Sequence, residues 1–116
     1  MKRDYSLFIK DILSAIEAIE TFVEGMDADS LSKDDKTSSA VIRKLEIIGE
    51  AAKHVPDDIR KLHPSIPWKS IAGMRDRLIH AYFGIDHKLV WDVIATKLPS
   101  MKKSLATAVA KLHKRK

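Results

Sequence analysis

The segment Arg75–Tyr82 brings together four side chains that could do chemistry as a group: Arg75, Asp76, His80 and Tyr82. His80 can carry a proton, because the pKa of an imidazole lies near neutrality. Arg75 is always cationic and can hold two oxygens of a phosphate, most tightly as negative charge builds on them. Asp76 could accept the second N–H of the imidazole, and Tyr82 could bind a phosphate or stack on a base. These residue types indicate acid–base chemistry at a phosphate.

The spacing of these residues limits how they can meet. On a continuous helix each residue turns by about 100°, so Arg75 and His80 lie roughly 140° apart. Asp76 and His80 would share one face of that helix, and Arg75 and Tyr82 would share another. Arg75 and His80 could reach one phosphate in two ways. Either the helix distorts before Gly84, or a second copy of the chain supplies the missing side across a two-fold interface.

Each of these residues also has a purely structural interpretation. Arg75 and Asp76 could be ordinary surface ions. His80 could lie half-buried at the C-terminal end of its helix, where a positive charge is favoured. Tyr82 could simply pack in an interface. Spacing alone does not decide between the chemical and the structural interpretation.

The charge of the chain adds a general preference for anionic partners. The formal net charge is +5, with Lys111, Lys114, Arg115 and Lys116 near the end of the sequence. Such a balance favours a polyanion such as nucleic acid. Beside the motif, Lys69 and Arg77 are candidate phosphate contacts, although a solvated side chain is the commoner role for such residues.

The elements that must position the motif are helices. Apolar residues recur three and four positions apart, and no segment alternates convincingly as a strand does. Helices are expected over about residues 4–24, 34–54, 57–63, 67–84, 86–98 and 100–113, with a polar loop over 26–33. Gly25 and Pro56 mark helix ends, Asp86 can cap a helix, and Pro99 should break or kink one. The sequence therefore predicts a single domain, residues 1–116, with an all-α, up-and-down antiparallel bundle.

Several classes of site are disfavoured. The chain has no cysteine, so thiolate metal sites and cysteine nucleophiles are excluded. The histidines outside the motif lack ligand spacing, and the acidic run from Asp27 to Asp35 lacks the glycine and glutamate of a calcium loop. No glycine-rich phosphate loop is present. We therefore expect no metal and no cofactor. No apolar run approaches the roughly 18 residues of a membrane span, and we expect a cytoplasmic protein.

Four ordered blocks of the sequence resemble one family. They are the motif Arg75–Tyr82 (Arg, four residues, His, one residue, Tyr), Leu45–Lys53, Pro67–Met74, and Asp86 with Leu89–Trp91 and Leu98–Pro99. Together they are similar to the HepT-like branch of the HEPN superfamily, over about residues 5–112. An Arg-x4-His pattern alone would be weak; four blocks in order are specific.

The resemblance implies a function and a set of roles. It implies an all-helical, two-fold dimer that acts as a metal-independent endoribonuclease toxin on tRNA or mRNA, with Arg75 and His80 catalytic and Asp76 supporting His80. Many family members carry Asn in place of Asp76, and the carboxylate should raise the pKa of His80. Lys69 and Arg77, which the resemblance does not assign, stay candidate RNA contacts on their charge alone. The antitoxin would be a minimal nucleotidyltransferase of the MntA type, which neutralises the toxin by attaching AMP to Tyr82.

Two other interpretations remain open at this point. The chain could be a non-catalytic HEPN module that binds RNA or nucleotide, or a scaffold for the nucleotidyltransferase. It could also be a purely structural helical dimer, which would leave the clustered polar motif without a purpose.

Overall fold

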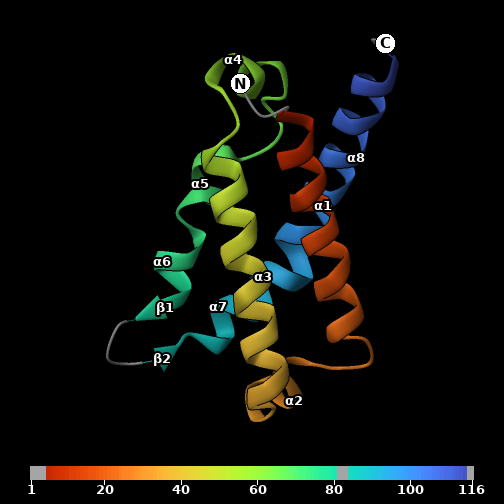
Figure 1. Cartoon of the computed structure of the whole chain (residues 1–116). Coiled ribbons are helices and arrows are strands. Elements are labelled where there is room, and N and C mark those ends of the chain that lie inside the picture. Colours follow the sequence, from red (N-terminus) through yellow and green to blue (C-terminus); the bar gives the residue numbers. More distant parts are fainter. Residues whose placement is uncertain (1–4, 81–83, 115–116) are drawn as a thin grey trace.

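The computed structural model describes residues 5–80 and 84–114, and the side chains of these residues except 75, 78–80 and 111–114. Figure 1 shows the course of the chain. In order, the elements are α1 (Tyr5–Phe22), α2 (Ala28–Lys33), α3 (Asp35–Lys53), α4 (Asp57–Leu62), α5 (Trp68–Ala72), α6 (Met74–Leu78), β1 (Ile79–His80), β2 (Gly84–Ile85), α7 (His87–Asp92), the π-helical turn η1 (Val93–Lys97) and α8 (Leu98–Lys114).

The all-α bundle is confirmed. α1 and α3 run antiparallel and pack along each other, and α8 packs on α1 (Figure 1). Their apolar faces follow the predicted spacing, and the fully buried side chains include Ile9, Ile12, Ile16, Ile19, Leu45, Ile48 and Leu105. Burying an aliphatic side chain of this size contributes about 1.5–3 kcal/mol. This apolar seam holds α3 in place as the helix against which the motif segment packs.

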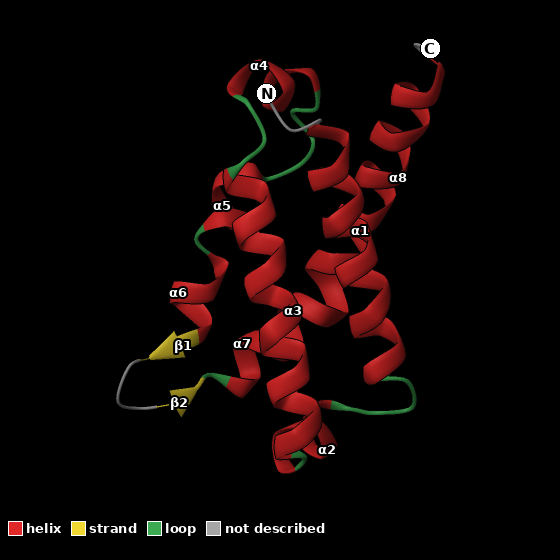
Figure 2. Ribbon diagram, in the orientation of Figure 1, coloured by secondary structure: helices red, strands yellow, loops and turns green. Residues whose placement is uncertain are grey.

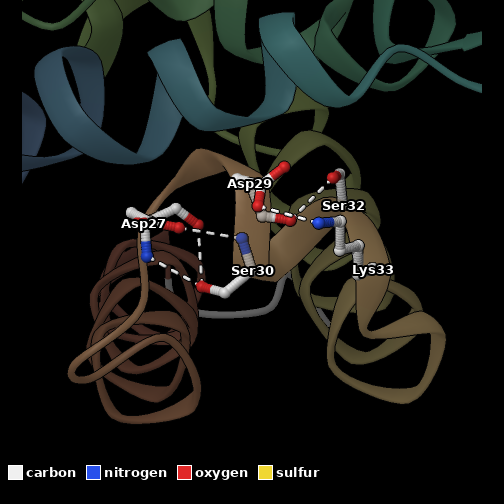
Figure 3. A network of polar contacts seen from close by, with 5 residues as sticks. All are labelled: Asp27, Asp29, Ser30, Ser32 and Lys33. Carbon is white, nitrogen blue, oxygen red and sulfur yellow. Dashed lines mark hydrogen bonds and ion pairs between the residues drawn. The ribbon is translucent and has the colours of Figure 1, made fainter.

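The loop predicted over 26–33 is wrong in part, because α2 forms there. Asp27 accepts a hydrogen bond from the Ser30 backbone N–H (2.8 Å), and Ser30 Oγ accepts one from the Asp27 N–H (2.9 Å) (Figure 3). This reciprocal capping box satisfies two donors that a short helix would otherwise leave unpaired. Leu31, 1% exposed, then anchors the helix in the core. The expected stop at Gly25 is confirmed by its φ of 78°.

The acidic run after α1 consists largely of helix caps. Asp34 caps α3 by accepting from the Thr37 N–H at 3.0 Å. Hydrogen bonds from the Ser30 and Thr37 backbone N–H groups, respectively, lower the pKa of Asp27 and of Asp34. A carboxylate near a helix N-terminus is also favoured by the helix dipole. These positions explain the acidic run without a bound ion.

The segment that leads to the motif is held against α3 at a glycine. A Cβ at Gly49 would lie 3.3 Å from the carbonyl oxygen of Ile71, so α5 approaches the backbone of α3 closely there. At the C-terminal end of α3, the Arg60 side chain donates hydrogen bonds to the carbonyls of Ala52 (2.7 Å) and Val55 (3.0 Å). The indole N–H of Trp68 lies 3.2 Å from the carbonyl of Arg60. These contacts fix the start of α5.

The single helix predicted over 67–84 is wrong. α5 ends at Ala72, the short α6 covers Met74–Leu78, and the chain then leaves the helical conformation. Ile79 pairs with Ile85 and His80 with Gly84 in a two-residue antiparallel ladder, which Figure 2 shows in yellow. Gly84 has a φ of 82°, a conformation that glycine adopts at little cost. Gly84 therefore belongs to a hairpin and does not close a helix.

The last helices follow the prediction with one change. Asp86 caps α7 by accepting from the Leu89 N–H at 3.1 Å, as expected. The chain then passes without a break through η1 into α8, which begins at Leu98 and not at Ser100. Pro99 has no N–H and its ring would clash with the carbonyl four residues earlier. The wide π-helical turn directly before it relieves this conflict, so the predicted disturbance appears as a π bulge.

Candidate active site

The motif residues occupy two kinds of backbone. Arg75, Asp76 and Arg77 lie in α6, whereas His80 lies in β1. The side chains of Arg75 and His80 are not described, and Tyr82 lies outside the described residues. The roughly 140° separation expected on a continuous helix therefore does not apply, because the helix ends at Leu78.

This change corrects two expectations about geometry. Asp76 and His80 do not share a helical face, because Asp76 lies in α6 and His80 in β1. Their four-residue spacing therefore no longer predicts a contact between the two side chains. The helix is interrupted before Gly84, which is the first of the two arrangements that the sequence allows for Arg75 and His80.

Asp76 lines an open groove that borders the motif helix. The groove has a volume of about 740 Å³, and α1, α3, α5 and α6 all contribute to its walls. Phe8 lies on the α1 side, Glu50 and His54 on the α3 side, and Ala72 and Asp76 on the α5–α6 side. Because the close approach at Gly49 holds α5 against α3, the same contact positions Asp76 at the groove.

The predicted phosphate contacts lie on the surface beside the motif. Lys69 on α5 and Arg77 on α6 are both exposed. One guanidinium nitrogen of Arg77 donates to the carbonyl of Ser70 at 2.8 Å. This bond spans the break between α5 and α6, so Arg77 also has a structural role that the sequence did not indicate.

Sequence reasoning missed a second group of side chains in the groove. Phe8 from α1 stacks on His54 at the end of α3, with ring centroids 5.2 Å apart and planes inclined by 18°. Glu50, one helical turn before His54, lies 3.8 Å from its Nε2. The i, i+4 pair Glu50–His54 is visible in the sequence, but only the packing of α1 on α3 brings Phe8 to it.

The described residues offer no metal site and no membrane span. Among residues 5–80 and 84–114, no three His, Asp or Glu side chains gather closely enough to hold a metal ion. Within the same part of the chain, no helix is long and apolar enough to cross a bilayer.

Comparison with known proteins identifies the family. The family model described as "Ribonuclease HepT-like" matches residues 12–108. A protein of Thermococcus cleftensis named "Probable ribonuclease HepT" is 49% identical over 102 residues, which cover 88% of this chain and 93% of that protein. Two proteins of Methanocaldococcus jannaschii, named "Putative RNase MJ0127" and "Putative RNase MJ0125", are 46% and 43% identical. Their alignments cover 85% and 98% of this chain, and 82% and 98% of the relatives, respectively. No solved structure gives a significant match. The chain therefore belongs to the family of HepT-like ribonucleases.

Proposed function

We propose that the chain is a metal-independent endoribonuclease that acts as the toxin of a toxin–antitoxin pair. The observation that carries this proposal is the family match over residues 12–108, because that range includes the whole motif from Arg75 to Tyr82. The groove beside α6 gives an RNA strand a place to lie next to the motif.

The chemistry needs only the substrate and two side chains. A proton passes from the ribose 2′-OH to His80, the 2′-oxygen forms a bond to phosphorus, and the bond to the 5′-oxygen breaks. The leaving oxygen takes up a proton, so the products are a 2′,3′-cyclic phosphate and a 5′-OH end. Arg75 stabilises the charge that builds on the phosphoryl oxygens. Asp76 lines the groove beside α6, and we assign to its carboxylate the electrostatic stabilisation of protonated His80.

Regulation is proposed to act on Tyr82. A minimal nucleotidyltransferase of the MntA type would attach AMP to the phenol and so silence the toxin. The added phosphate and base would occupy the place of the RNA phosphate and repel it by charge. We further propose a two-fold homodimer in the cytoplasm with both motifs on one cleft. Lys69 and Arg77 are proposed to hold the RNA backbone, and the support for this is their exposed position beside α6.

Cleavage rates of site variants test the catalytic assignment. Arg75→Ala and His80→Ala should each lower the cleavage rate of single-stranded RNA by about a hundredfold or more, the usual scale for one acid–base or charge-stabilising group. Lys103→Ala, at an exposed position of α8, serves as the control and should retain the wild-type rate. Cells that express Arg75→Ala or His80→Ala should grow, whereas expression of the wild type or of the control variant should arrest growth. No cleavage by the wild type would instead favour a non-catalytic RNA-binding or scaffold module. Equal measurable rates for the wild type and His80→Ala would refute the catalytic role of His80.

A further inference from the structure

The wall of the groove carries a flat aromatic platform. His54 is the C-cap residue of α3, and one face of its ring lies against Phe8 with 5.2 Å between centroids. Its side chain is nevertheless 58% exposed. Because His54 also lines the groove, the exposed part of its imidazole is accessible there to a flat ligand. Successive bases of a single strand stack on such surfaces, because every base has a π face.

The Glu50 carboxylate lies beside the His54 ring. Glu50 Oε2 lies 3.8 Å from His54 Nε2, and the Glu50 side chain is 64% exposed. An ionised carboxylate has two acceptor oxygens and no donor. It therefore matches a base edge that offers two adjacent N–H groups, and guanine offers these at N1 and N2. Adenine and uracil have no such pair of neighbouring donors.

The groove that contains the platform reaches α6, the helix that carries the first residues of the motif. Asp76, next to Arg75 in the chain, lines the same hollow as His54 and Glu50. Its volume of about 740 Å³ falls within the range of sites that bind small organic ligands, roughly 300–1,000 Å³. Arg43 and Lys53 also line the groove, next to the carboxylates of Asp11 and Glu46. These two cations are the groups of the lining that can contact phosphates of the same strand.

The composition of the groove favours a nucleobase over a second protein. Seven of the twelve lining residues carry ionisable side chains, whereas the buried centre of a protein interface is depleted in charged residues. An unpaired base presents an apolar face and a polar edge, which the aromatic platform and the carboxylate match. Duplex RNA would hide that edge in base pairs.

We propose that the groove binds an unpaired guanine of single-stranded RNA, stacked on His54 and hydrogen-bonded to Glu50, beside the phosphate that is cleaved. This inference rests on the proposed ribonuclease function and adds a preference for sequence to it. His54 and Glu50 are specificity residues in this account and take no part in proton transfer.

Binding of uncleavable RNA tests the inference independently of catalysis. The probe is a fluorescent 2′-O-methyl pentanucleotide of uridines with one central guanine or one central adenine, and the readout is anisotropy. The wild type should bind the guanine probe at least about tenfold more tightly than the adenine probe. His54→Ala should bind the guanine probe about tenfold or more weakly than the wild type does, the size expected for one stacking contact. His54→Phe should restore the affinity, since it keeps a flat ring. Glu50→Gln should bind both probes within about twofold of each other. Glu24→Gln, an exposed carboxylate beyond the end of α1, is the matched control and should behave as wild type.

The outcomes separate this inference from the proposed function. RNA cleavage by the wild type without a guanine preference, or a preference that survives in both His54→Ala and Glu50→Gln, would overturn the guanine site alone. Guanine-dependent binding without cleavage of any RNA would keep the site and refute the ribonuclease. Variants that change the oligomeric mass in light scattering but not the base preference would show that the groove is a contact between copies, which also overturns the inference.

Discussion

At the scale of single residues, the sequence identified the motif but not its geometry. Arg75, Asp76 and His80 were chosen for their chemistry and spacing, and the family match includes all three positions. Their expected helical phase was wrong, because α6 ends at Leu78 and His80 lies in β1. The pair Phe8–His54 could not be predicted, since 46 positions separate its members and only the packing of α1 on α3 joins them.

Tyr82 is expected to be a control point and not an indispensable catalyst. Phenols ordinarily titrate near pH 10 and are poor proton carriers at neutral pH, whereas an imidazole such as that of His80 suits proton transfer. Tyr82→Phe should therefore keep much of the cleavage rate and toxicity but escape neutralisation by the cognate nucleotidyltransferase. Intact-mass measurement after co-expression should show added AMP on the wild type and none on the variant. A variant that is still modified, or that is as inactive as His80→Ala, would refute this role.

At the scale of elements, the long helices were predictable and the short ones were not. The apolar faces of α1 and α3 repeat over many turns, and their bounds were predicted to within about two residues. The short α2 depends on one capping box and on the burial of Leu31. A single cap and a single apolar residue do not distinguish a short helix from a polar loop in the sequence. The hairpin β1–β2 depends on a two-residue ladder at Gly84, which helical periodicity on both sides concealed.

The cap of α3 should make stability depend on pH. The hydrogen bond from the Thr37 backbone N–H lowers the pKa of Asp34 below the ordinary value of an aspartate. A lowered pKa in the folded state stabilises the fold above the unfolded pKa, and this contribution is lost as pH falls through the folded value. Asp34→Asn keeps a capping acceptor without a titrating group. The melting temperature of the wild type should therefore fall more than that of Asp34→Asn between pH 6 and about pH 3. Equal losses would show that the charge of Asp34 contributes nothing to the fold.

The contact at Gly49 should tolerate little added volume. A Cβ there would already lie 3.3 Å from the Ile71 carbonyl oxygen and 3.5 Å from that of Ala72. Gly49→Val adds two further methyl groups and should lower the free energy of unfolding by about 1–3 kcal/mol, as overpacking does. Gly73→Ala is the matched control, because its Cβ would meet only the Lys69 carbonyl at an ordinary 3.6 Å. Urea denaturation measures both. If Gly49→Val is as stable as Gly73→Ala, the close approach does not restrict this position.

At the scale of the whole molecule, the proposed two-fold dimer rests on the family resemblance of the sequence. The positive net charge of +5 suits a molecule that attracts RNA from solution. Light scattering at micromolar concentration should give twice the mass of one chain. A monomer that cleaves RNA at the full rate would show that one copy of Arg75 and His80 suffices.

The central claim is that the chain cleaves RNA through its own side chains and the 2′-OH of the substrate, without a metal ion. The most direct test is the chemistry of the RNA ends produced by the purified wild type in excess EDTA, read by mass spectrometry. The account predicts undiminished cleavage with 2′,3′-cyclic phosphate (or the derived 3′-phosphate) and 5′-OH ends, and about a hundredfold less product from His80→Ala. Cleavage that EDTA abolishes and magnesium restores, with 5′-phosphate ends, would contradict it.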